Sequence, residues 1–584
     1  MKKKWILINK KADFEAIGLR YHVDPVLAKV VTNRGIVTEE DLDFYFSEAD
    51  APLKLTGEMK DIAKGAEILL DEIKRQSKIL VIGDYDADGI CSTAILLKTI
   101  NKLGGEVSFR IPRRIEDGYG MNEQMVEEAK AASVSCIITC DNGISCFSAV
   151  ERAKELGIKI IITDHHQIPT EESLDGKIQI VPKADAVINP HQSDCPYPFE
   201  DICGAMVALR FSEKILSMSG IELSAGDDIY DLAAVATVTD IMPLIQENRQ
   251  LVKNRLNKIP QSKNLGLRTL CELKVPGKER LTSYDIGHLI GPCMNATGRI
   301  STADIAVELL MTEDKQRAKY IADEMQKLNA ERISMTVDGA TEGIAIAETM
   351  SLDKVLVIYM PDLHESIAGL VAGKIREHTG KPTLVVTKAD NGAKGSGRSI
   401  DEYSMSDELA KCKDILTKYG GHPMAAGFSL PVEKIDELRI RLNENCVLPL
   451  EGLLPKVKVD VAMPFGYVTE KLLDELQKLE PTGRGNEAPV FAQRDILVRT
   501  ITFMGDQKQH MRLVGEVDGR RYQLVLFGRA TEFMDYIEEK YGAENKQDIL
   551  SGKVDDIRIK VAYTPKVNEY NGRRTIQYII NQYE

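Results

Sequence analysis

The chain has 584 residues, a length that predicts three or four domains at about 150 residues each. Hydrophobic residues make up 43%, charged residues 28% and aromatic residues 6%, which is typical of a globular protein and excludes collagen, coiled coil and disorder. Lysine and arginine number 75 against 89 acidic residues, and the net charge of −14 argues against a nucleic-acid binder whose whole surface is basic.

The sequence contains no recognisable targeting segment or membrane span. The N-terminal segment has an apolar run of only four residues, and no stretch approaches the ~18 apolar residues of a membrane-spanning helix. The ten cysteines mostly stand singly within apolar segments and lack the spacing of a zinc site. We therefore expect a cytoplasmic protein with reduced thiols and no membrane contact.

Residues 1–75 are expected to form an N-terminal helical segment, and a different pattern follows over 76–250. There, apolar runs of strand length alternate with helical patterns such as 92–102 and 145–156. The expected strands are 78–83, 107–111, 136–140, 159–163 and 178–181. This alternation predicts an α/β domain with a parallel sheet covered on both faces, which binds ligands beyond the carboxyl ends of its strands.

Three further segments complete the expected organisation. Residues 251–350 are predicted to be a helical connector, and 351–450 a second α/β domain with a glycine-rich loop at 392–399. Short alternating strands over 456–584 predict a small β-barrel. That segment holds 20 basic and 20 acidic residues, so the whole acidic excess lies in the first 455 residues. The average charge therefore does not exclude a local groove for nucleic acid.

Three aspartates follow the first expected strand in a tight turn. Asp84, Asp86 and Asp88 occupy alternating positions and precede Gly89, as in the first half of an EF-hand calcium loop. Residues 96–98 are Leu-Leu-Lys where that loop needs its bidentate glutamate, which argues against an EF-hand. Three neighbouring carboxylates are costly unless a positive charge holds them together.

Similar residues recur at the ends of later elements. Asp141 follows the strand 136–140, Asp164-His165-His166 follow the strand 159–163, and Asp240 ends a helical segment. Alone, each would be a helix cap or a core histidine, but together they form a ligand set suited to Mn²⁺ or Mg²⁺ and possible for Zn²⁺. Pairs of such ions ~3.5–4 Å apart serve phosphoester hydrolysis. The residues alone therefore predict a dinuclear metal hydrolase.

These motifs resemble the four motifs of the DHH phosphoesterase superfamily, and the segment 84–89 (Asp-Tyr-Asp-Ala-Asp-Gly) is similar to the form found in its RecJ family. The resemblance covers nearly the whole chain. Further matching segments are 291–300, 364–369, 395–399, 420–422 and 479–486. Cys293, Thr297 and Thr482 depart from the family pattern, so no role is carried to position 293. The resemblance implies DHH, DHHA1 and OB-fold domains in that order.

The resemblance also implies a role for each matching residue. Asp84 and Asp86 would hold one metal ion, Asp141 would bridge, and the second ion would be held by Asp88, His165 and Asp240. The catalytic residues would be His166, Asp141 and Arg299. The substrate-binding residues would be Asn295, Arg299, Gly397, Arg398, Ser399, Gly421 and His422. Backbone N–H groups of the glycine-rich loop and the Arg398 guanidinium suit phosphate. Helix capping and a surface ion pair are the alternative for Asn295 and Arg299.

The implied function is a two-metal exonuclease acting on single-stranded DNA, 5′ to 3′, in repair and recombination. It would be a monomer, with a single-strand-binding protein and a helicase as partners. In the OB-like segment Tyr522, Phe527 and Arg529 could contact the strand, although each could equally be core or edge. Two alternatives stay open: a phosphodiesterase of cyclic dinucleotides or short oligonucleotides, and a non-catalytic replication scaffold.

Overall fold

The chain folds into two compact units. The computed structural model describes residues 4–47, 58–173, 176–224, 226–389, 392–449, 456–554, 556–570 and 573–584. Residues 49–453 form one unit, and residues 1–48 together with 454–584 form the other. The expected N-terminal segment 1–75 is thus divided between the two units. Across the described ranges, no helix combines the length and apolar character needed to cross a bilayer.

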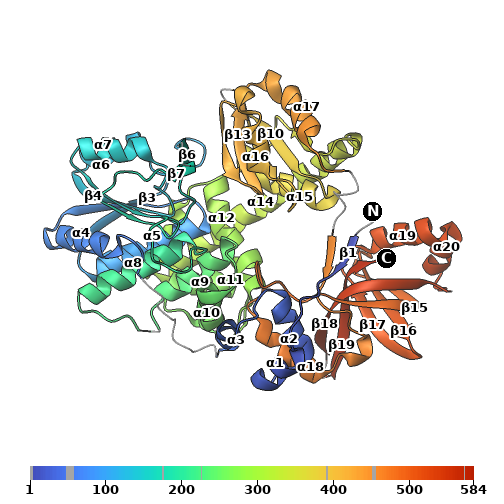
Figure 1. Cartoon of the computed structure of the whole chain (residues 1–584). Helices are drawn as coiled ribbons and strands as arrows, with labels where there is room; N and C mark the ends of the chain where they lie inside the picture. Colours follow the sequence, from blue (N-terminus) through green and yellow to red (C-terminus); the bar gives the residue numbers. More distant parts are fainter. Residues whose placement is uncertain are drawn as a thin grey trace. The chain divides into compact units, whose positions relative to one another are not determined.

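The first domain of the large unit is a parallel sheet with helices on both faces (Figure 1). Its strands, in the order β3-β2-β4-β5-β8, are β3 (Glu106–Arg110), β2 (Lys78–Ile82), β4 (Val134–Cys140), β5 (Lys159–Thr163) and β8 (Ala186–Ile188). Alternate strand residues enter two separate cores, so Ile79 packs with helices α4 (Ile62–Lys74), α5 (Ala87–Lys102) and α8 (Gly204–Met218), and Leu80 with α6 (Glu123–Ala131) and α7 (Phe147–Glu155). The sheet confirms the predicted α/β class.

The expected strand 178–181 is wrong as a member of this sheet. Residues Gly176–Gln179 form β7, which pairs only with β6 (Thr170–Ser173) in a separate two-stranded hairpin. The edge position belongs to the three-residue strand β8 instead. Ile178 is 55% exposed, whereas the β8 residues are buried, and burial on both faces is what a strand of a parallel sheet requires.

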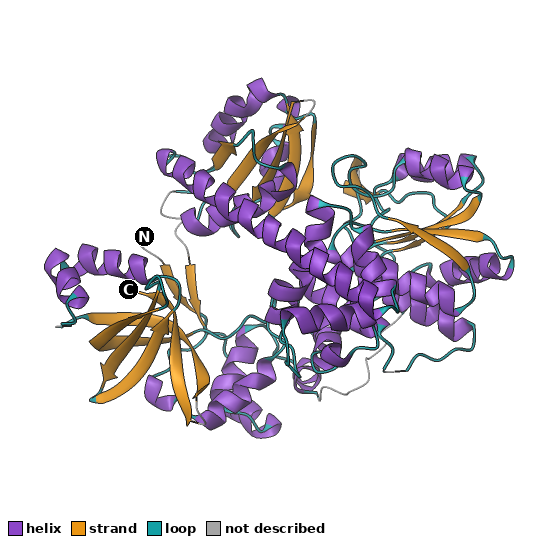
Figure 2. Ribbon diagram, turned by 180° about the vertical axis from the view of Figure 1, so that it is seen from behind, coloured by secondary structure: helices purple, strands orange, loops and turns teal. Residues whose placement is uncertain are grey.

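A helical region joins the two α/β domains. It comprises α9 (Ile229–Thr239), α10 (Gln246–Arg255), α11 (Leu265–Lys274), a π-helix (Asp285–Ile290), α12 (Gly291–Ile300), α13 (Asp304–Met311) and α14 (Lys315–Thr349). Helix α14 has 35 residues, and Figure 2 shows it running from the helical region to the second domain. It packs against α11, α12 and α13 and also against α15 (Ala368–Thr379).

The second domain is a five-stranded mixed sheet in the order β12-β13-β11-β10-β9. Its strands are β12 (Lys418–His422), β13 (Ala425–Leu430), β11 (Gly392–Arg398), β10 (Thr383–Ala389) and β9 (Leu356–Tyr359), covered by α15, α16 (Met405–Ala410) and α17 (Ile435–Asn445). The prediction of a glycine-rich loop is wrong because 392–398 are strand β11, paired on both sides. Glycine is needed at 395, where a Cβ would lie 2.2 Å from the Phe428 ring.

The small unit is built on a closed five-stranded barrel, as predicted for the C-terminal segment. The barrel order is β15-β16-β17-β19-β18. Its strands are β15 (Phe491–Met504), β16 (His510–Val517), β17 (Arg520–Leu526), β19 (Arg573–Tyr583) and β18 (Arg558–Tyr570), and the helices α18 (Glu470–Leu476), α19 (Ala530–Tyr541) and α20 (Ala543–Leu550) also belong to this unit. Aromatic rings fill the barrel, with the Phe465 ring 4.3 Å from the Tyr578 ring.

The two ends of the chain form this unit together. β1 (Lys4–Leu7) pairs in parallel with β14 (Lys456–Val459). Helices α2 (Pro25–Asn33) and α3 (Glu39–Phe46) contribute buried residues to the barrel core, and α1 (Phe14–Tyr21) packs partly buried residues against it. Polar contacts join the same segments: Asn33 Nδ2 donates to the Asp460 carbonyl at 3.0 Å, and the buried Tyr45 hydroxyl donates to Asn486 Oδ1 at 2.8 Å. The N-terminal helices are therefore part of the barrel unit.

Replacing Tyr45 with Phe should destabilise the small unit by about 1–3 kcal/mol, because the buried Asn486 Oδ1 loses a donor. Trp5 is the single tryptophan of the chain and packs beside Val457 and Val459, so its fluorescence in a urea titration reports this unit. The control is Tyr21→Phe, whose hydroxyl bonds Asp43 at an exposed position and should cost little. Equal urea midpoints for Tyr45→Phe and the wild type would contradict this account.

Candidate metal centre

The chemically active residues meet at one edge of the parallel sheet. β2 and β4 are hydrogen-bonded neighbours, as are β4 and β5, so the residues that follow them emerge side by side. Asp84 lies beyond β2, Asp141 directly follows β4, and Asp164 directly follows β5. Asp141 adopts a positive φ of 61°, and its amide bonds the Thr163 carbonyl at 3.0 Å, which turns the chain sharply at the strand end.

Two helix N-termini support the first acidic motif. Asp86 is the N-cap of α5, and its carboxylate accepts from the amides of Asp88 at 2.9 Å and Gly89 at 3.1 Å. The Asp88 carboxylate accepts from the amides of Gly204 and Ala205, both at 2.7 Å, in the first turn of α8. The positive ends of the two helices therefore partly offset the charge of these acids.

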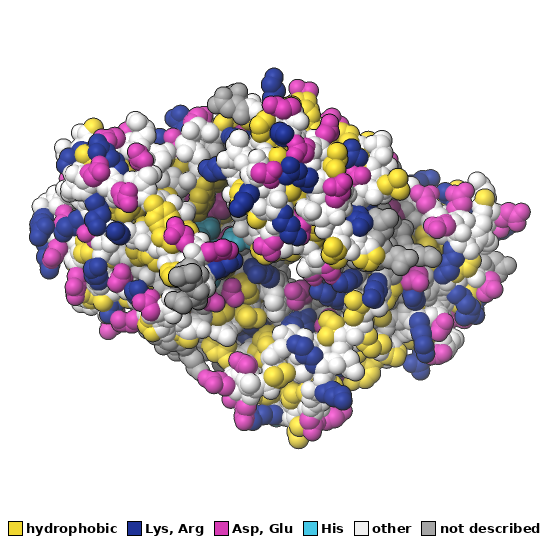
Figure 3. Space-filling model, turned by 45° about the horizontal axis from the view of Figure 1, so that its top comes forward, with side chains coloured by type: hydrophobic (Ala, Val, Ile, Leu, Met, Phe, Trp, Pro, Cys, Tyr) yellow, Lys and Arg dark blue, Asp and Glu magenta, His cyan; other side chains and the backbone are white. Residues whose placement is uncertain are grey.

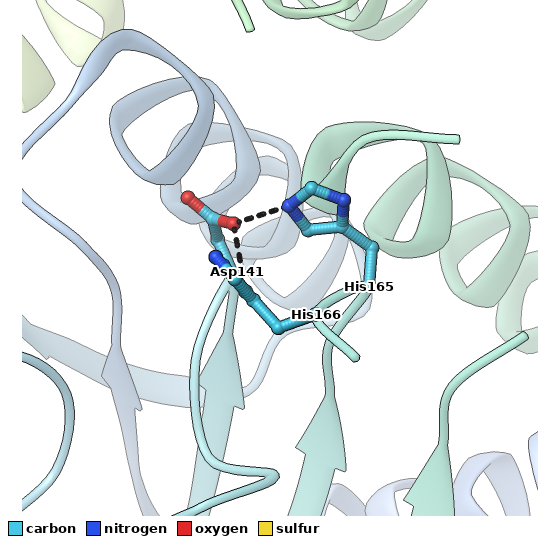
Figure 4. A group of neighbouring side chains, drawn as sticks. All are labelled: Asp141, His165 and His166. Atoms are coloured by element: carbon cyan, nitrogen blue, oxygen red, sulfur yellow. Dashed lines mark ion pairs between the residues drawn. The ribbon is translucent and has the colours of Figure 1, made fainter. Parts of the chain in front are cut away.

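The carboxylates and imidazoles form three overlapping groups whose ligand atoms lie within 4.8 Å of one another. The groups are Asp84 with Asp86 and Asp141, Asp88 with His165 and Asp240, and Asp141 with His165 and His166. His165 Nε2 is central, 3.1 Å from Asp141 Oδ1, 3.6 Å from Asp88 Oδ2 and 3.8 Å from Asp240 Oδ2. Figure 4 shows both imidazoles directed toward the Asp141 carboxylate.

The donor set fits divalent cations. Asp84, Asp88 and Asp141 are at most 3% exposed, and neither Asp84 Oδ1 nor Asp141 Oδ1 makes a hydrogen bond. Burial, reinforced by neighbouring aspartates, raises the pKa of all three carboxyls. Burial also lowers the pKa of His165 to about 3, so its imidazole is neutral, the form that binds metal. Buried oxygen lone pairs with no proton donor beside a neutral imidazole constitute a cation site.

His166 is in a different electrostatic state. Its Nδ1 lies 2.8 Å from Asp164 Oδ1. Burial lowers the pKa of His166, but the Asp164 carboxylate outweighs burial and raises it to about 9. Burial likewise raises the pKa of Asp164, but the imidazolium outweighs burial and lowers it to about 2. Asp164 is also held by the Ile144 amide at 2.9 Å. His166 therefore carries a positive charge at neutral pH, close to Asp141.

Arginines gather on the side of the centre formed by α12. Arg299 Nη1 donates to the Ser366 carbonyl at 2.6 Å, which ties α12 to the second domain. Arg114 Nε donates to the Gly298 carbonyl at 3.2 Å, and its guanidinium lies 3.7 Å from the centre of the Tyr85 ring. Burial, together with the charge of Arg114, lowers the pKa of Arg299 to about 10. These cations face the buried acids without pairing with a described carboxylate.

Several predicted substrate contacts are occupied by the fold itself. Asn295 Oδ1 accepts from the Ala87 amide at 2.7 Å, which is the helix-capping alternative. Ser399 is fully buried and its hydroxyl donates to the Tyr403 carbonyl, so its contact with substrate stays a prediction. Gly397 sits within β11, where its backbone pairs with neighbouring strands. A Cβ there would lie 2.9 Å from Met405 Sδ. In this structure Gly397 and Ser399 shape the second domain, and Asn295 caps α5.

The remaining predicted residues are accessible. Arg398 is half-buried beside Ser396, and Gly421 and His422 lie on the exposed edge strand β12. Burial and the charge of His166 lower the pKa of His422, which places it in electrical reach of the centre. In the barrel unit, Phe527 is 54% exposed, while Arg529 binds the Asn581 carbonyl at 3.0 Å. Tyr522 packs on the core ring of Phe465.

Two residues near the centre had not been predicted. Arg114 follows β3, and Tyr119 donates from its hydroxyl to the Asp141 carbonyl at 2.9 Å and lies 3.1 Å from the His166 ring. The position of Arg114 could have been predicted from the sequence, because residues that follow a strand of a parallel sheet emerge at its ligand-binding edge. Histidine side chains are visible within a hollow of the molecular surface (Figure 3). The side chain of His166 is 34% exposed, so the centre is open to a ligand.

Comparison with known proteins agrees with this geometry. The model of the DHH family N-terminal domain matches residues 78–237, that of the DHHA1 domain 352–447, and that of the RecJ OB domain 459–582. The single-stranded-DNA-specific exonuclease RecJ of Bacillus subtilis is 32% identical over 99% of this chain and 70% of its own length. RecJ of Salmonella typhimurium is 30% identical over 100% and 99%.

Solved structures give the same relationship. The crystal structure of Thermus thermophilus RecJ in complex with Mn²⁺ has a TM-score of 0.82 at 25% identity, covering 100% of this chain and 79% of that chain. An exonuclease RecJ bound to manganese has a TM-score of 0.59 at 30% identity, covering 68% of this chain and 97% of that one. In sequence, domain order and fold, the chain belongs to the RecJ family.

Proposed function

We propose that the chain is a metal-dependent exonuclease that hydrolyses phosphodiester bonds of single-stranded DNA. The observation that carries the proposal is the pair of buried carboxylate oxygens without hydrogen bonds, Asp84 Oδ1 and Asp141 Oδ1, the second of which lies 3.1 Å from Nε2 of the neutral His165 imidazole. Divalent cations suit such a set, and a cation pair with arginines alongside is suited to phosphodiesters. The barrel unit supplies the single-strand specificity in this proposal, since OB folds bind unpaired strands.

The metal ligands are proposed residue by residue. Asp84, Asp86 and Asp141 would hold one divalent ion, Mn²⁺ or Mg²⁺, and Asp88, His165 and Asp240 the other, with Asp141 shared. Once bound, the ions supply an activated water and neutralise charge on the phosphate.

The other residues act through their own charge and hydrogen bonds. Asp164 keeps a proton on His166, so the imidazolium stabilises the negative charge that develops on the scissile phosphate. Tyr119 also holds the imidazole, with its hydroxyl 3.1 Å from Nδ1 and 3.2 Å from Nε2. Arg299 orients the phosphate from α12, and Arg398 grips a neighbouring phosphate from the second domain. These contacts place the reacting phosphorus in one geometry.

The proposal also includes features that rest on the family resemblance alone. They are 5′-to-3′ direction, a monomeric state, a cytoplasmic location, a role in repair and recombination, and association with a single-strand-binding protein and a helicase.

Asp141→Asn should lower the rate of Mn²⁺-dependent digestion of a 5′-phosphorylated single strand by more than about 100-fold. Loss of a residue that only supports a metal ligand costs up to about 100-fold, and Asp141 would itself be a ligand. Digestion of end-labelled strands, with each end blocked in turn, measures rate and direction. Asp194→Asn is the control, because that exposed carboxylate pairs only with Lys60 in the described structure and should keep full activity. Preference for a dinucleotide would replace the proposal with the phosphodiesterase alternative. A wild type inert toward both would favour the scaffold.

Mn²⁺ should raise the melting temperature more at pH 8 than at pH 5. Burial and Asp86 raise the pKa of Asp88 from 3.8 to about 6, so its proton contributes stability below pH 4 that is lost as pH rises through 6. Bound Mn²⁺ replaces that proton and contributes about 2.7 kcal/mol at 100 times its Kd, a gain of a few degrees. Differential scanning fluorimetry measures the shift. In Asp88→Asn the shift should be small at both pH values; equal wild-type shifts would contradict this assignment.

A further inference from the structure

The long helix α14 carries a buried stripe that is polar at one point. The buried residues of α14 are Ala318, Ile321, Ala322, Met325, Asn329, Thr336, Gly339, Ala340, Gly343 and Ala347. Arg332 lies three residues after Asn329 and four before Thr336, so it occupies the same face of the helix. Three successive positions of an otherwise apolar or small stripe are therefore polar, which pure packing does not require.

The polar section lies where α14 passes from one domain to the other. Its N-terminal half packs against α11, α12 and α13. Its C-terminal half is seated on the second domain, where a Cβ on Gly339 would lie 2.7 Å from Leu363 and one on Gly343 2.5 Å from Ile375. Arg299 on α12 also bridges the two domains through the Ser366 carbonyl. Arg332 thus sits at the domain junction that Arg299 also bridges.

The side chain of Arg332 is partly buried and lacks an anionic partner among the described residues. Its Nε and Asn329 Oδ1 are both buried without a hydrogen bond, and Asn329 is only 5% exposed. Within the described ranges, no carboxylate forms an ion pair with Arg332. Its titratable neighbour Cys293 is fully buried, and burial raises the pKa of that thiol, so it remains neutral. A guanidinium in these surroundings is costly until an anion reaches it.

Three other arginines share this environment. Arg114, Arg299 and Arg398 are half-buried, and none forms an ion pair with a carboxylate of the described residues. The charges of Arg114, Arg332 and Arg398 add to burial in lowering the pKa of Arg299, so these three guanidinium groups surround that of Arg299. Four like charges repel, and the arrangement becomes favourable only when a polyanion threads between them.

We propose that Arg332, with Asn329 beside it, forms a separate subsite for a phosphodiester of the substrate strand, next to the phosphate that Arg299 orients. The planar guanidinium binds a phosphate through two parallel hydrogen bonds, and the Asn329 amide can turn to present its N–H₂ group. Because the subsite lies on the helix that joins the domains, a strand bound there contacts both. The subsite rests on the proposed function, since it needs a strand in the centre.

The experiment measures the affinity of the whole, metal-free chain for a fluorescent single-stranded 20-mer by anisotropy, from 50 to 200 mM NaCl. Arg332→Gln should weaken binding about tenfold at 50 mM NaCl and reduce the slope of log K against log salt by about 0.7, the value for one phosphate contact on a single strand. Arg332→Lys should restore the slope. Arg317→Gln is the matched control on the same helix, because Arg317 pairs with Glu308 at an exposed position and should behave as wild type.

The outcomes separate the subsite from the function. Wild-type slope and affinity in Arg332→Gln would overturn the subsite, and so would weaker binding with an unchanged slope, which marks a purely structural role. If Arg332→Gln fails to fold, Arg332→Met decides in its place, because methionine keeps the apolar stem and removes the charge: a slope reduced by about 0.7 supports the subsite and a wild-type slope overturns it. Mn²⁺-dependent digestion of the same 20-mer by the wild type tests the proposed function independently. If the wild type digests the strand but Arg332→Gln binds it normally, the subsite fails and the proposed function stands.

Discussion

Mutual repulsion among buried carboxylates is the constraint around which the large unit is arranged. Asp84, Asp88 and Asp141 are withdrawn from water beside the strand ends. Burial and the charges of neighbouring aspartates raise the pKa of each of these three carboxyls. The fold offsets this cost with dipoles: the N-termini of α5 and α8 donate backbone amides to Asp86 and Asp88. It does not satisfy every oxygen, and the residual negative charge is what attracts metal ions and, through them, phosphate.

The same constraint explains the division of work between the two histidines. His165 is neutral because burial dominates, whereas His166 is positive because Asp164 dominates. Two adjacent residues thus provide a metal ligand and a cation. Arg299 and Arg114 place positive charge beside the centre, where it offsets the acids for an approaching strand. A net charge of −14 is compatible with this arrangement because an average over the whole chain does not fix the local charge of one site.

Much of the centre could be predicted from sequence because a parallel sheet places strand ends together. The strand at 159–163 was predicted with its observed bounds, and the acids after three strands converge as expected. Phosphate contacts were less predictable, because they depend on which strands pair in the sheet and on which side chains the fold already uses for its own hydrogen bonds. A run rich in glycine suggests a loop, yet Phe428 packs over Gly395 and makes the run a central strand. Likewise, the spacing of Asn329, Arg332 and Thr336 puts them on one face of α14, but the sequence does not show which elements pack against that face.

The composite barrel unit has a consequence for how the chain is made. Residues 1–48 leave the ribosome well before their partners, which begin at residue 454, about 400 residues later. At about 5–20 residues per second, the first helices wait on the order of tens of seconds before β14 and the barrel exist to receive them. The DHH and DHHA1 domains can fold during that interval, whereas β1 and the apolar faces of α2 and α3 stay uncovered. These apolar surfaces are therefore exposed until the barrel strands have been made, and become covered only when the barrel closes.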